Sequence, residues 1–447
     1  MEPGMEPYRV KSVEEIPFLT AKERKDAILK ADFNPYRMLA SNITIDLITD
    51  SGFSAMSTKQ WSAMMLGDES YAGSASFERY QSAVQDITGY KYVLPAHQGR
   101  ACEKVLFNAL VTEGSVIVNN NHYDSTKTNI SLNKGIALDI AMVTDDTADF
   151  PGNMDIDKLK KVLEEKGEEI PLVMITVTNN KMRGQPVSMA NIKAASYVCK
   201  AHGIPFILDG CRFAENSWFI KEREDGYGDM TPREIAKEMF SYADGCMISA
   251  KKDANSTMGG VLAMNSEDLY DQCVPYVIAT EGHTTYGGLS GRDLEAVAVG
   301  LYEVLDESYL RYRRANLKFF EEELISQGVP GVFPAGGHAI YLNANKLCPK
   351  IPADEFPGLT FAGLLYIESG VRCLDIGSFS PNASDLIRLA VPRRVYTTEH
   401  LKYVARMIAR VAEKNKDRET GLTMTRSRTK SAQYKHVTGS FKMKEDM

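Results

Sequence analysis

The sequence predicts an α/β protein built around a largely parallel sheet and followed by a smaller α+β region. Between about residues 90 and 265, short β-branched runs alternate with segments that carry apolar residues at helical spacing, a pattern typical of βαβ units. From about residue 305 onward, strands and helices mix without that alternation. A length of 447 residues suits this division, because one domain typically takes about 150 residues.

Each expected element follows from a local pattern of apolar and turn-forming residues. Strands of the first region are expected at 90–94, 115–119, 136–143, 172–178, 204–209, Gly245–Ser249 and Gly260–Met264. Ser188 is the expected N-cap of a helix with one apolar stripe, and Gly203 its expected stop. In the second region we expect helices at 308–327 and 399–414 and strands at 339–342 and 387–391. The resulting domains are an N-terminal arm with part of the small domain (1–56), a large domain (57–305) and a small C-terminal domain with a basic tail (306–447).

The composition excludes several classes of protein. There are 52 Lys and Arg against 59 Asp and Glu, a net charge of −7, which disfavours nucleic acid and anionic membranes as partners. No stretch approaches the roughly 18 consecutive apolar residues of a membrane span, and the N-terminus has no apolar segment of a secretory signal. Seven scattered cysteines contain no CxxC motif, so neither a disulfide framework nor a zinc ribbon is indicated. We therefore expect a cytoplasmic enzyme that acts on a small molecule.

The residues that follow the expected strands carry the candidate chemistry, because ligands of open parallel sheets bind beyond the carboxyl ends of the strands. His97-Gln98-Gly99-Arg100 opens a helix, where backbone N–H groups, a glycine and a fixed cation favour a phosphate. Taken alone, the tetrapeptide is better explained as an ordinary strand–helix turn.

Two further strand ends carry an aspartate and a lysine pair. Asp209 either caps a turn or lies beneath a heteroaromatic nitrogen, which it keeps protonated by raising its pKa. Lys252, beside Lys251, is either exposed or forms a Schiff base within a cleft. A phosphate cradle, an aspartate and a Schiff-base lysine, in this order, describe an enzyme of pyridoxal 5'-phosphate (PLP). These residues alone leave an unrelated α/β enzyme open.

The chain as a whole resembles the β-eliminating lyases, the family of tryptophanase and tyrosine phenol-lyase. The resemblance covers nearly the whole chain and rests on seven strings in order: Asp46-Leu-Ile-Thr-Asp-Ser-Gly52, Gly67-Asp-Glu-Ser-Tyr-Ala-Gly73, His97-Gln-Gly-Arg100, Gly184-Gln-Pro-Val-Ser188, Ser249-Ala-Lys-Lys-Asp253, Thr285-Tyr-Gly-Gly288 and Pro392-Arg393. It implies the type I PLP fold of the aspartate aminotransferase kind, a homotetramer with active sites shared between subunits, and a potassium ion.

The resemblance also implies a role for each matching residue. Lys252 would be the Schiff-base lysine and the base for the α-proton, and Tyr71 the general acid near the leaving group. Cofactor contacts would come from Gln98, Gly99, Arg100, Ser249 and Lys251 at the phosphate, Tyr123 on the ring, Asp209 at the pyridinium nitrogen, and Asn180 and Arg212 at the ring oxygen. Thr49, Ser51 and Arg388 would bind the substrate carboxylate, with a guanidinium fork suited to it. Gly52, Glu69 and Thr257 resemble the potassium site.

Three positions resemble tryptophanases rather than phenol-lyases. Ile376 stands where phenol-lyases carry an arginine for the phenol oxygen, so a buried phenol would lack a partner. Asp124 follows Tyr123, where phenol-lyases carry threonine, and His436 matches a tail histidine near the indole. Singly, each residue has an ordinary structural explanation as core, turn or tail. Together they favour L-tryptophan, which would give indole, pyruvate and ammonia.

Four departures leave the leaving group open. Asn180-Lys-Met-Arg-Gly184 replaces a double-glycine loop and brings Met182 and Arg183 towards the cofactor edge. Gly210 and Cys211 replace other small residues, His283 replaces Phe or Met, and residues 378–385 form a shorter loop. Tyrosine, or an amino acid with a more polar or anionic β-substituent, is the alternative substrate. A non-catalytic paralogue that keeps the fold as a scaffold is a third hypothesis.

Overall fold

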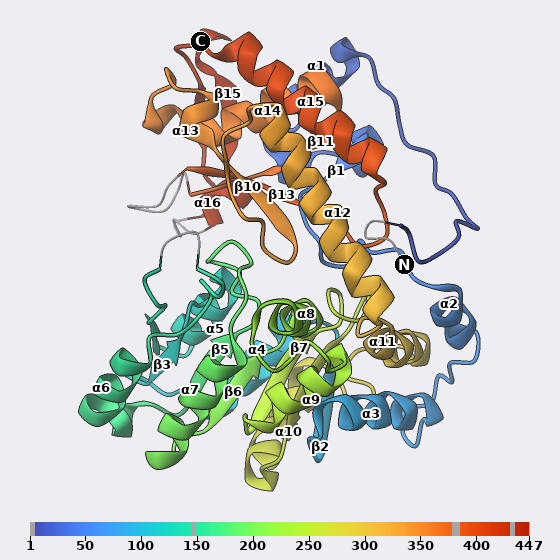
Figure 1. Cartoon of the computed structure of the whole chain (residues 1–447), viewed down its shortest axis with the longest axis vertical. Coiled ribbons are helices and arrows are strands. Elements are labelled where there is room, and N and C mark those ends of the chain that lie inside the picture. Colours follow the sequence, from blue (N-terminus) through green and yellow to red (C-terminus); the bar gives the residue numbers. More distant parts are fainter. Residues whose placement is uncertain (1–4, 145–147, 378–384, 430–433, 447) are drawn as a thin grey trace. The chain divides into compact units, whose positions relative to one another are not determined.

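The computed structural model of the chain describes residues 5–144, 148–377, 385–429 and 434–446 and divides into two compact units (Figure 1). Ser51–Arg313 form the first unit, and the described parts of Gly4–Asp50 and Arg314–Met447 form the second. These boundaries lie a few residues from the expected 56 and 305. The predicted loop at 378–385 lies outside the described residues except for Asp385. No helix in the described part of the chain is long and apolar enough to cross a bilayer.

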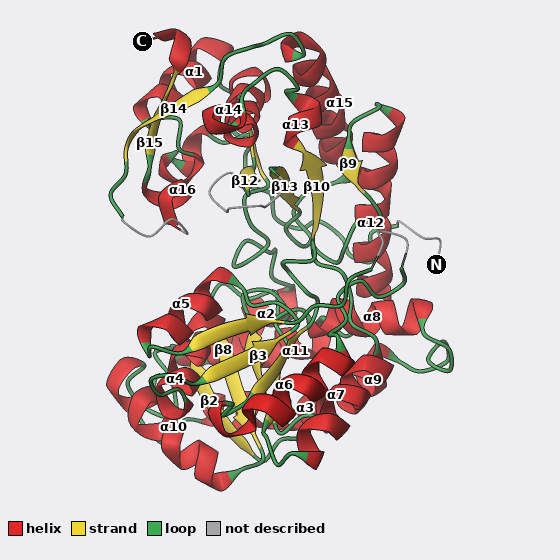
Figure 2. Cartoon of the chain, turned by 90° about the vertical axis from the view of Figure 1, so that its left-hand side faces the viewer, coloured by secondary structure: helices red, strands yellow, loops and turns green. Residues whose placement is uncertain are grey.

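The first unit contains a seven-stranded sheet covered by helices on both faces (Figure 2). The strand order is β2-β8-β7-β6-β5-β3-β4, and only β8 runs antiparallel to its neighbours. The strands are β2 (Tyr92–Ala96), β3 (Val116–Asn119), β4 (Ile136–Asp139), β5 (Val173–Thr176), β6 (Phe206–Asp209), β7 (Gly245–Ser249) and β8 (Gly260–Met264). The mostly parallel sheet predicted from the sequence is therefore confirmed.

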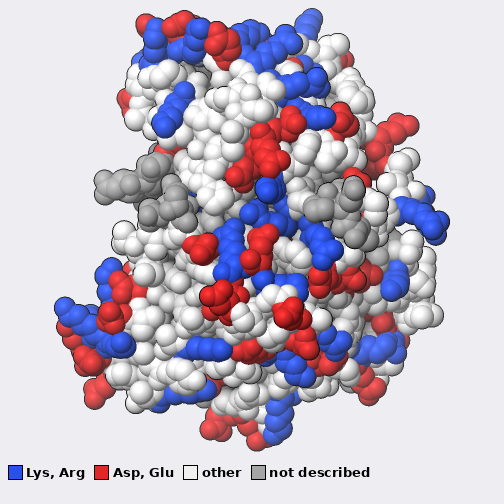
Figure 3. Space-filling view, in the orientation of Figure 1, with Lys and Arg blue, Asp and Glu red and all other residues white. Residues whose placement is uncertain are grey.

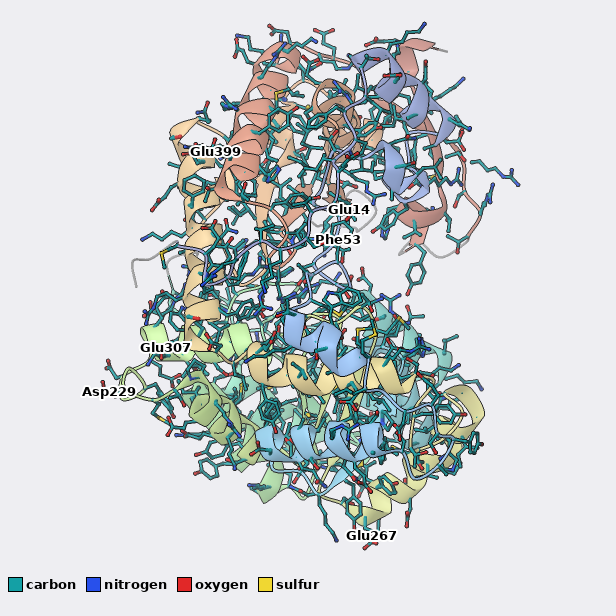
Figure 4. The ribbon with its side chains drawn as sticks, turned by 90° about the vertical axis from the view of Figure 1, so that its right-hand side faces the viewer. Glu14, Phe53, Asp229, Glu267, Glu307 and Glu399 are labelled. Carbon is teal, nitrogen blue, oxygen red and sulfur yellow. The ribbon has the colours of Figure 1, made fainter. Side chains whose placement is uncertain are left out.

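Burial on both faces explains the continuous apolar runs of these strands. Successive residues alternate between two apolar clusters: Met174 and Ile207 face one, and Ile175 and Leu208 face the other. The helices of this unit are α2 (Thr58–Met64), α3 (Ala75–Thr88), α4 (Gly99–Leu110), α5 (Asp124–Leu132), α6 (Ile156–Lys166), α7 (Met189–Ala201), α8 (Phe213–Arg223), α9 (Pro232–Ser241), α10 (Glu267–Thr280) and α11 (Gly291–Glu303). Helices α2 and α3 lie on either side of α11 (Figure 4).

Most of the expected elements are present, and several strands were predicted too long, most of all the strand at 136–143. Ser188 accepts a hydrogen bond from the Asn191 amide as the N-cap of α7, and Gly203 follows the helix with a φ of +67°. The strand expected at 136–143 ends at Asp139, because its parallel neighbour β3 ends at Asn119. The expectation that it continues to residue 143 was wrong, since beyond Asp139 the chain leaves β3 and forms only an isolated antiparallel bridge, between Ala141 and Met154.

The second unit is an α+β structure with a four-stranded antiparallel sheet, as predicted for this region. The order is β12-β13-β10-β9, formed by β9 (Gly331–Val332), β10 (Ala339–Asn343), β12 (Leu374–Ile376) and β13 (Leu386–Ala390). Short pairs join β1 (Ile45–Asp46) to β11 (Val371–Arg372) and β14 (Leu422–Arg426) to β15 (Ser440–Met443). The helices are α1 (Ala21–Lys30), α12 (Glu307–Ser326, shared with the first unit), α13 (Ala344–Leu347), α14 (Pro357–Ser369), α15 (Thr398–Asn415) and α16 (Lys435–Thr438).

Candidate active site

The predicted cofactor residues of the first unit follow the strand ends at one edge of the sheet. Strands β2, β3, β5, β6 and β7 all run in one direction, so their carboxyl ends share this edge. Antiparallel β8 begins at the same edge, at Gly260, which pairs with Ser249. Short strand–helix connections therefore bring residues far apart in the sequence to one location.

The first group at this edge is a tightly packed turn at the start of α4. Gln98 is the N-cap residue of this helix, and its side chain makes no capping hydrogen bond. A Cβ on Gly99 would lie 2.8 Å from the Ser249 Cβ, and one on Gly260 would lie 2.5 Å from the Gln98 carbonyl carbon. The glycines thus let the helix start approach the ends of β7 and β8, where backbone amides can bind an anion.

Three cations gather beside this turn. Burial, then the charges of Arg100 and Lys252, lower the pKa of Lys251. The backbone of Lys251 is held in place, because the Gly52 amide donates to its carbonyl oxygen at 2.7 Å. Clustered cations lower one another's pKa values, and a bound anion stabilises their charged forms. The arrangement fits a phosphate.

A buried carboxylate lies at the end of β6, the strand that pairs with β7. Asp209, at the end of β6, is buried, and its Oδ1 accepts a hydrogen bond from the Cys211 amide at 3.1 Å. The field of Asp209 reaches Cys211 and Glu103, whose pKa values are raised first by burial and then also by this aspartate. The field of Lys252 reaches the same two groups, so Asp209 and Lys252 share one environment. Arg212 is buried close by, and its amide donates to the Val177 carbonyl oxygen at 3.1 Å.

Two residues that support this environment had no assigned role in the sequence analysis. Asp253 is buried, and its Oδ2 accepts a 2.7 Å hydrogen bond from the Ala214 amide, which ties the Lys252 turn to the start of α8. Glu103 accepts a 2.6 Å hydrogen bond from the Thr126 hydroxyl and thereby joins α4 to α5. Glu103 lies four residues after Gly99, and helical spacing alone predicts that the two residues share one face of α4.

The turn after β3 carries Tyr123, the N-cap residue of α5, and Asp124, its first residue. Asp124 Oδ1 accepts a 2.6 Å hydrogen bond from Lys181 Nζ, from the loop that follows β5. Asn180, on the same loop, has a buried side-chain oxygen without a hydrogen-bond partner among the described residues. His122 is fully buried beside Tyr123, and its Nδ1 lies 2.7 Å from Asp139 Oδ1.

Tyr71 lies outside these strand ends, in an aromatic group with His283 and Tyr286. Its ring centroid is 5.3 Å from that of His283 and 5.5 Å from that of Tyr286, and its side chain is 67% exposed. The Thr285 hydroxyl donates to the Tyr71 carbonyl oxygen at 2.9 Å and contacts His283 Nδ1 at the same distance. His283, a departure noted in the sequence, is thus a direct neighbour of the expected general acid.

The expected potassium ligands are only partly placed together. The Thr257 carbonyl oxygen lies 3.2 Å from the position of a Cβ on Gly52, so these two residues are neighbours. Glu69 instead binds the Gly291 amide and Arg292 Nε, at 3.1 and 3.0 Å. No group of three or more His, Cys, Asp or Glu side chains with metal-binding geometry occurs in the described part of the chain.

The remaining expected residues, apart from Ser51 at the start of the first unit, belong to the second unit. Arg388 is buried on β13 and donates to the Ile48 carbonyl oxygen at 3.0 Å, next to Thr49 in sequence. His436 lies on α16, with its ring 5.7 Å from that of Tyr36. Ile376 ends β12 opposite Leu386, in a small apolar cluster that includes Tyr341.

Comparison with known proteins identifies the family. The model of the "Beta-eliminating lyase" family matches residues 46–407. The chain is a β-eliminating lyase. Similar relatives include a tryptophanase of Salinibacter ruber (46% identical; 90% of this chain and 89% of that protein) and one of Hyphomonas neptunium (45%; 99% of each). A tyrosine phenol-lyase of Symbiobacterium thermophilum is 42% identical over 94% of this chain and 95% of that protein.

Solved structures agree on the fold of this lyase. A serine palmitoyltransferase of Sphingomonas wittichii superposes with a TM-score of 0.60 at 14% identity, covering 88% of this chain and 96% of that one. A SepCysS–SepCysE N-terminal domain complex gives 0.56 at 16% identity, covering 84% and 96%. The predicted type I PLP fold is confirmed.

The family implies PLP, and the side chains at the sheet edge fit this cofactor. Its phosphate matches the cations Arg100 and Lys251 beside the Gly99 turn. A heteroaromatic ring matches the buried Asp209 and the buried oxygen of Asn180, which has no hydrogen-bond partner among the described residues. The side chains at this edge therefore fit the cofactor that the family implies.

Proposed function

We propose that this lyase converts L-tryptophan and water into indole, pyruvate and ammonia. The observation that carries this proposal is the surrounding of Ile376, which packs against a buried, largely apolar cluster of Ala339, Tyr341 and Ala390. The isoleucine side chain itself offers no polar group to a phenol oxygen, and an unpaired buried polar group costs about 1–3 kcal/mol. Indole carries one N–H donor and otherwise an apolar surface, so it suits an apolar wall.

The proposed roles follow from the placement of each group. PLP, when bound, supplies the electron sink that makes the α-proton of the substrate acidic. Lys252, at the turn after β7, would accept that proton, and Tyr71 would donate one to the leaving carbon. Arg388, with Thr49 and Ser51, would hold the substrate carboxylate through paired N–H groups. Gln98, Gly99, Arg100 and Ser249 would hold the phosphate, Tyr123 would cover the ring, and Asn180 and Arg212 would bind its oxygen.

The test is a comparison of products from three amino acids. The purified protein with PLP and potassium is given tryptophan, tyrosine and S-methyl cysteine, and indole, phenol and pyruvate are measured. Tryptophan is expected to give stoichiometric indole and pyruvate, with little phenol from tyrosine. A kcat/KM for tyrosine above that for tryptophan would contradict the proposal. Replacement of His436 should reduce turnover of tryptophan more than that of S-methyl cysteine, and equal losses would remove His436 from the indole site.

A polar or anionic β-substituent is the second candidate. The observation that favours it is Arg183, which occupies a left-handed backbone conformation (φ +63°) that an arginine rarely adopts. Arg183 lies on the loop that also carries Asn180, and a cation there would attract an anionic β-substituent. Higher kcat/KM for an anionic β-substituted alanine than for tryptophan would favour this candidate.

We also propose that a potassium ion binds the carbonyl oxygens of Gly52 and Thr257 with the carboxylate of Glu69. The proximity of Gly52 to the Thr257 oxygen supports the first two ligands. Oxygen ligands of this kind suit a hard cation. Replacement of potassium by sodium should lower kcat, and Glu69→Gln should reduce the difference between the two ions. Equal activity in both salts would exclude the site.

The exposed apolar residues near α2 support a homotetramer. Trp61, Met65 and Leu66 are exposed, as is Phe53 just before the helix (Figure 4). Such clusters usually mark a protein–protein interface, whereas acidic and basic residues are interspersed over the face of the first unit in Figure 3. Light scattering should give four times the mass of the chain, and a monomer would contradict the assembly.

Seven cysteines without disulfides support a cytoplasmic location, which cell fractionation tests.

A further inference from the structure

A lysine that replaces a small residue of the family loop contacts the aspartate expected at the leaving group. Lys181 follows Asn180 after β5, and Asp124 follows Tyr123 after β3. Strands β3 and β5 are neighbours in the sheet, with Val118 opposite Val173. The Nζ–Oδ1 distance is 2.6 Å, and the two side chains are 35% and 33% exposed. The ion pair therefore joins two loops that each carry an expected cofactor residue.

The backbone that carries Lys181 is fixed by its own hydrogen bonds. The Gly184 amide donates to the Asn179 carbonyl oxygen at 2.9 Å, and the Met182 amide donates to Asn179 Oδ1 at 3.2 Å. Asn179 Nδ2 also donates to Asn121 Oδ1 at 2.9 Å, which links this loop directly to the turn after β3. Lys181 thus projects from a rigid loop towards a turn to which that loop is already tied.

The ion pair explains little of the stability of the fold. Ion pairs that are partly exposed to solvent contribute about 0–1 kcal/mol to the free energy of unfolding. The hydrogen bond between Asn179 and Asn121 also already joins the two loops. Its main effect is on the position of Asp124, which also lies in the first turn of α5, where the helix dipole favours an anion. The contact with Lys181 and the helix start together hold this carboxylate in one position.

We propose that Lys181 is a positioning residue that holds the Asp124 carboxylate as an acceptor for the N–H group of the leaving indole. An ionised carboxylate only accepts hydrogen bonds, and the indole nitrogen only donates. Lys181 binds Oδ1 and thereby fixes the direction of the whole carboxylate, whose two oxygens together can accept several hydrogen bonds. The inference rests on the proposed turnover of tryptophan and adds a residue that sets its specificity.

The test compares Lys181→Met with Lys181→Arg, using tryptophan and S-methyl cysteine as substrates. Lys181→Met is expected to lower kcat/KM for tryptophan about tenfold, the size of one charge-assisted hydrogen bond. S-methyl cysteine has no N–H in its leaving group, so its kcat/KM should stay within about twofold. Lys181→Arg keeps the cation and should recover most of the loss. Calorimetry of free indole should show weaker binding to the PLP-loaded Lys181→Met protein.

A matched control is Lys193→Met. Lys193 Nζ lies 2.8 Å from Glu238 Oε1, with side chains 32% and 26% exposed, so it forms a comparable ion pair between helices α7 and α9. This variant should treat both substrates as the wild type does. Equal losses of Lys181→Met on both substrates, or no loss on either, would refute the positioning role while wild-type release of indole still supports the proposed function. A wild type that releases no indole would refute both.

Discussion

Replacement of Gly99 by alanine tests whether the close approach of α4 to β7 forms the phosphate site. A Cβ at this position would lie 2.8 Å from the Cβ and 3.2 Å from the Cα of Ser249. Ordinary contacts begin at 3.4 Å, so the helix start must retreat by about 0.6 Å. Ser249 cannot yield easily, because it is buried and paired with Gly260 in the sheet.

Two opposing effects decide the magnitude. Helix propensity alone favours alanine over glycine by up to about 1 kcal/mol. Overpacking of a buried contact costs about 1–3 kcal/mol, so the clash prevails and the variant is expected to be less stable by about 1–2 kcal/mol. The displacement of the helix start also moves the backbone amides that would bind the phosphate, so PLP binding should weaken by about tenfold to a hundredfold.

The assay is a titration of the apoprotein with PLP, followed by its absorption spectrum, together with thermal unfolding. Gly167→Ala is the control, because no atom of the described residues lies within 4 Å of its Cβ position and its φ is −50°. The double variant Gly99→Ala/Ser249→Gly removes the nearest clashing atom and should recover stability but not PLP affinity, since Ser249 is itself an expected ligand. Wild-type affinity and stability of Gly99→Ala would refute the reasoning.

Three further variants or conditions test the lysine turn. Lys252→Ala should abolish elimination, and borohydride reduction of the wild type followed by peptide mapping should place the cofactor on Lys252; a label elsewhere would refute this role. The pKa of Lys251 is lowered by burial and by Arg100 and Lys252, so at pH values around that lowered pKa phosphate binding should take up a proton and should weaken as the pH rises. Calorimetry in buffers of different ionisation enthalpy measures the uptake, and a pH-independent affinity would contradict it. Asp253→Ala leaves the buried Ala214 amide unpaired and should cost about 1–3 kcal/mol of unfolding free energy, whereas Asp253→Asn keeps an acceptor and should cost less.

Parts of the fold were predictable because their patterns are local. Strands β7 and β8 match their expected bounds, since both are apolar runs bounded by turn-forming residues. Strand β4 was predicted too long, because its end depends on where its neighbour β3 ends, which the strand's own residues do not encode. The pairing of Lys181 with Asp124 was equally invisible, because 57 residues separate them and only the order of β3 and β5 brings them together.

The charges at the sheet edge also explain why one carboxylate can act there alone. Glu103 and Asp209 share this environment, and two ionised carboxylates would together neutralise the cations that a phosphate requires. Burial and then the field of Asp209 raise the pKa of Glu103, which opposes a second negative charge beside Asp209. Arg100 and Lys252 add positive charge around Lys251 and lower its pKa, which favours a bound anion at this place. In the proposed site, the phosphate of PLP would meet Arg100 and Lys251 and its ring nitrogen would meet Asp209, so each end of the cofactor would have a partner of opposite charge.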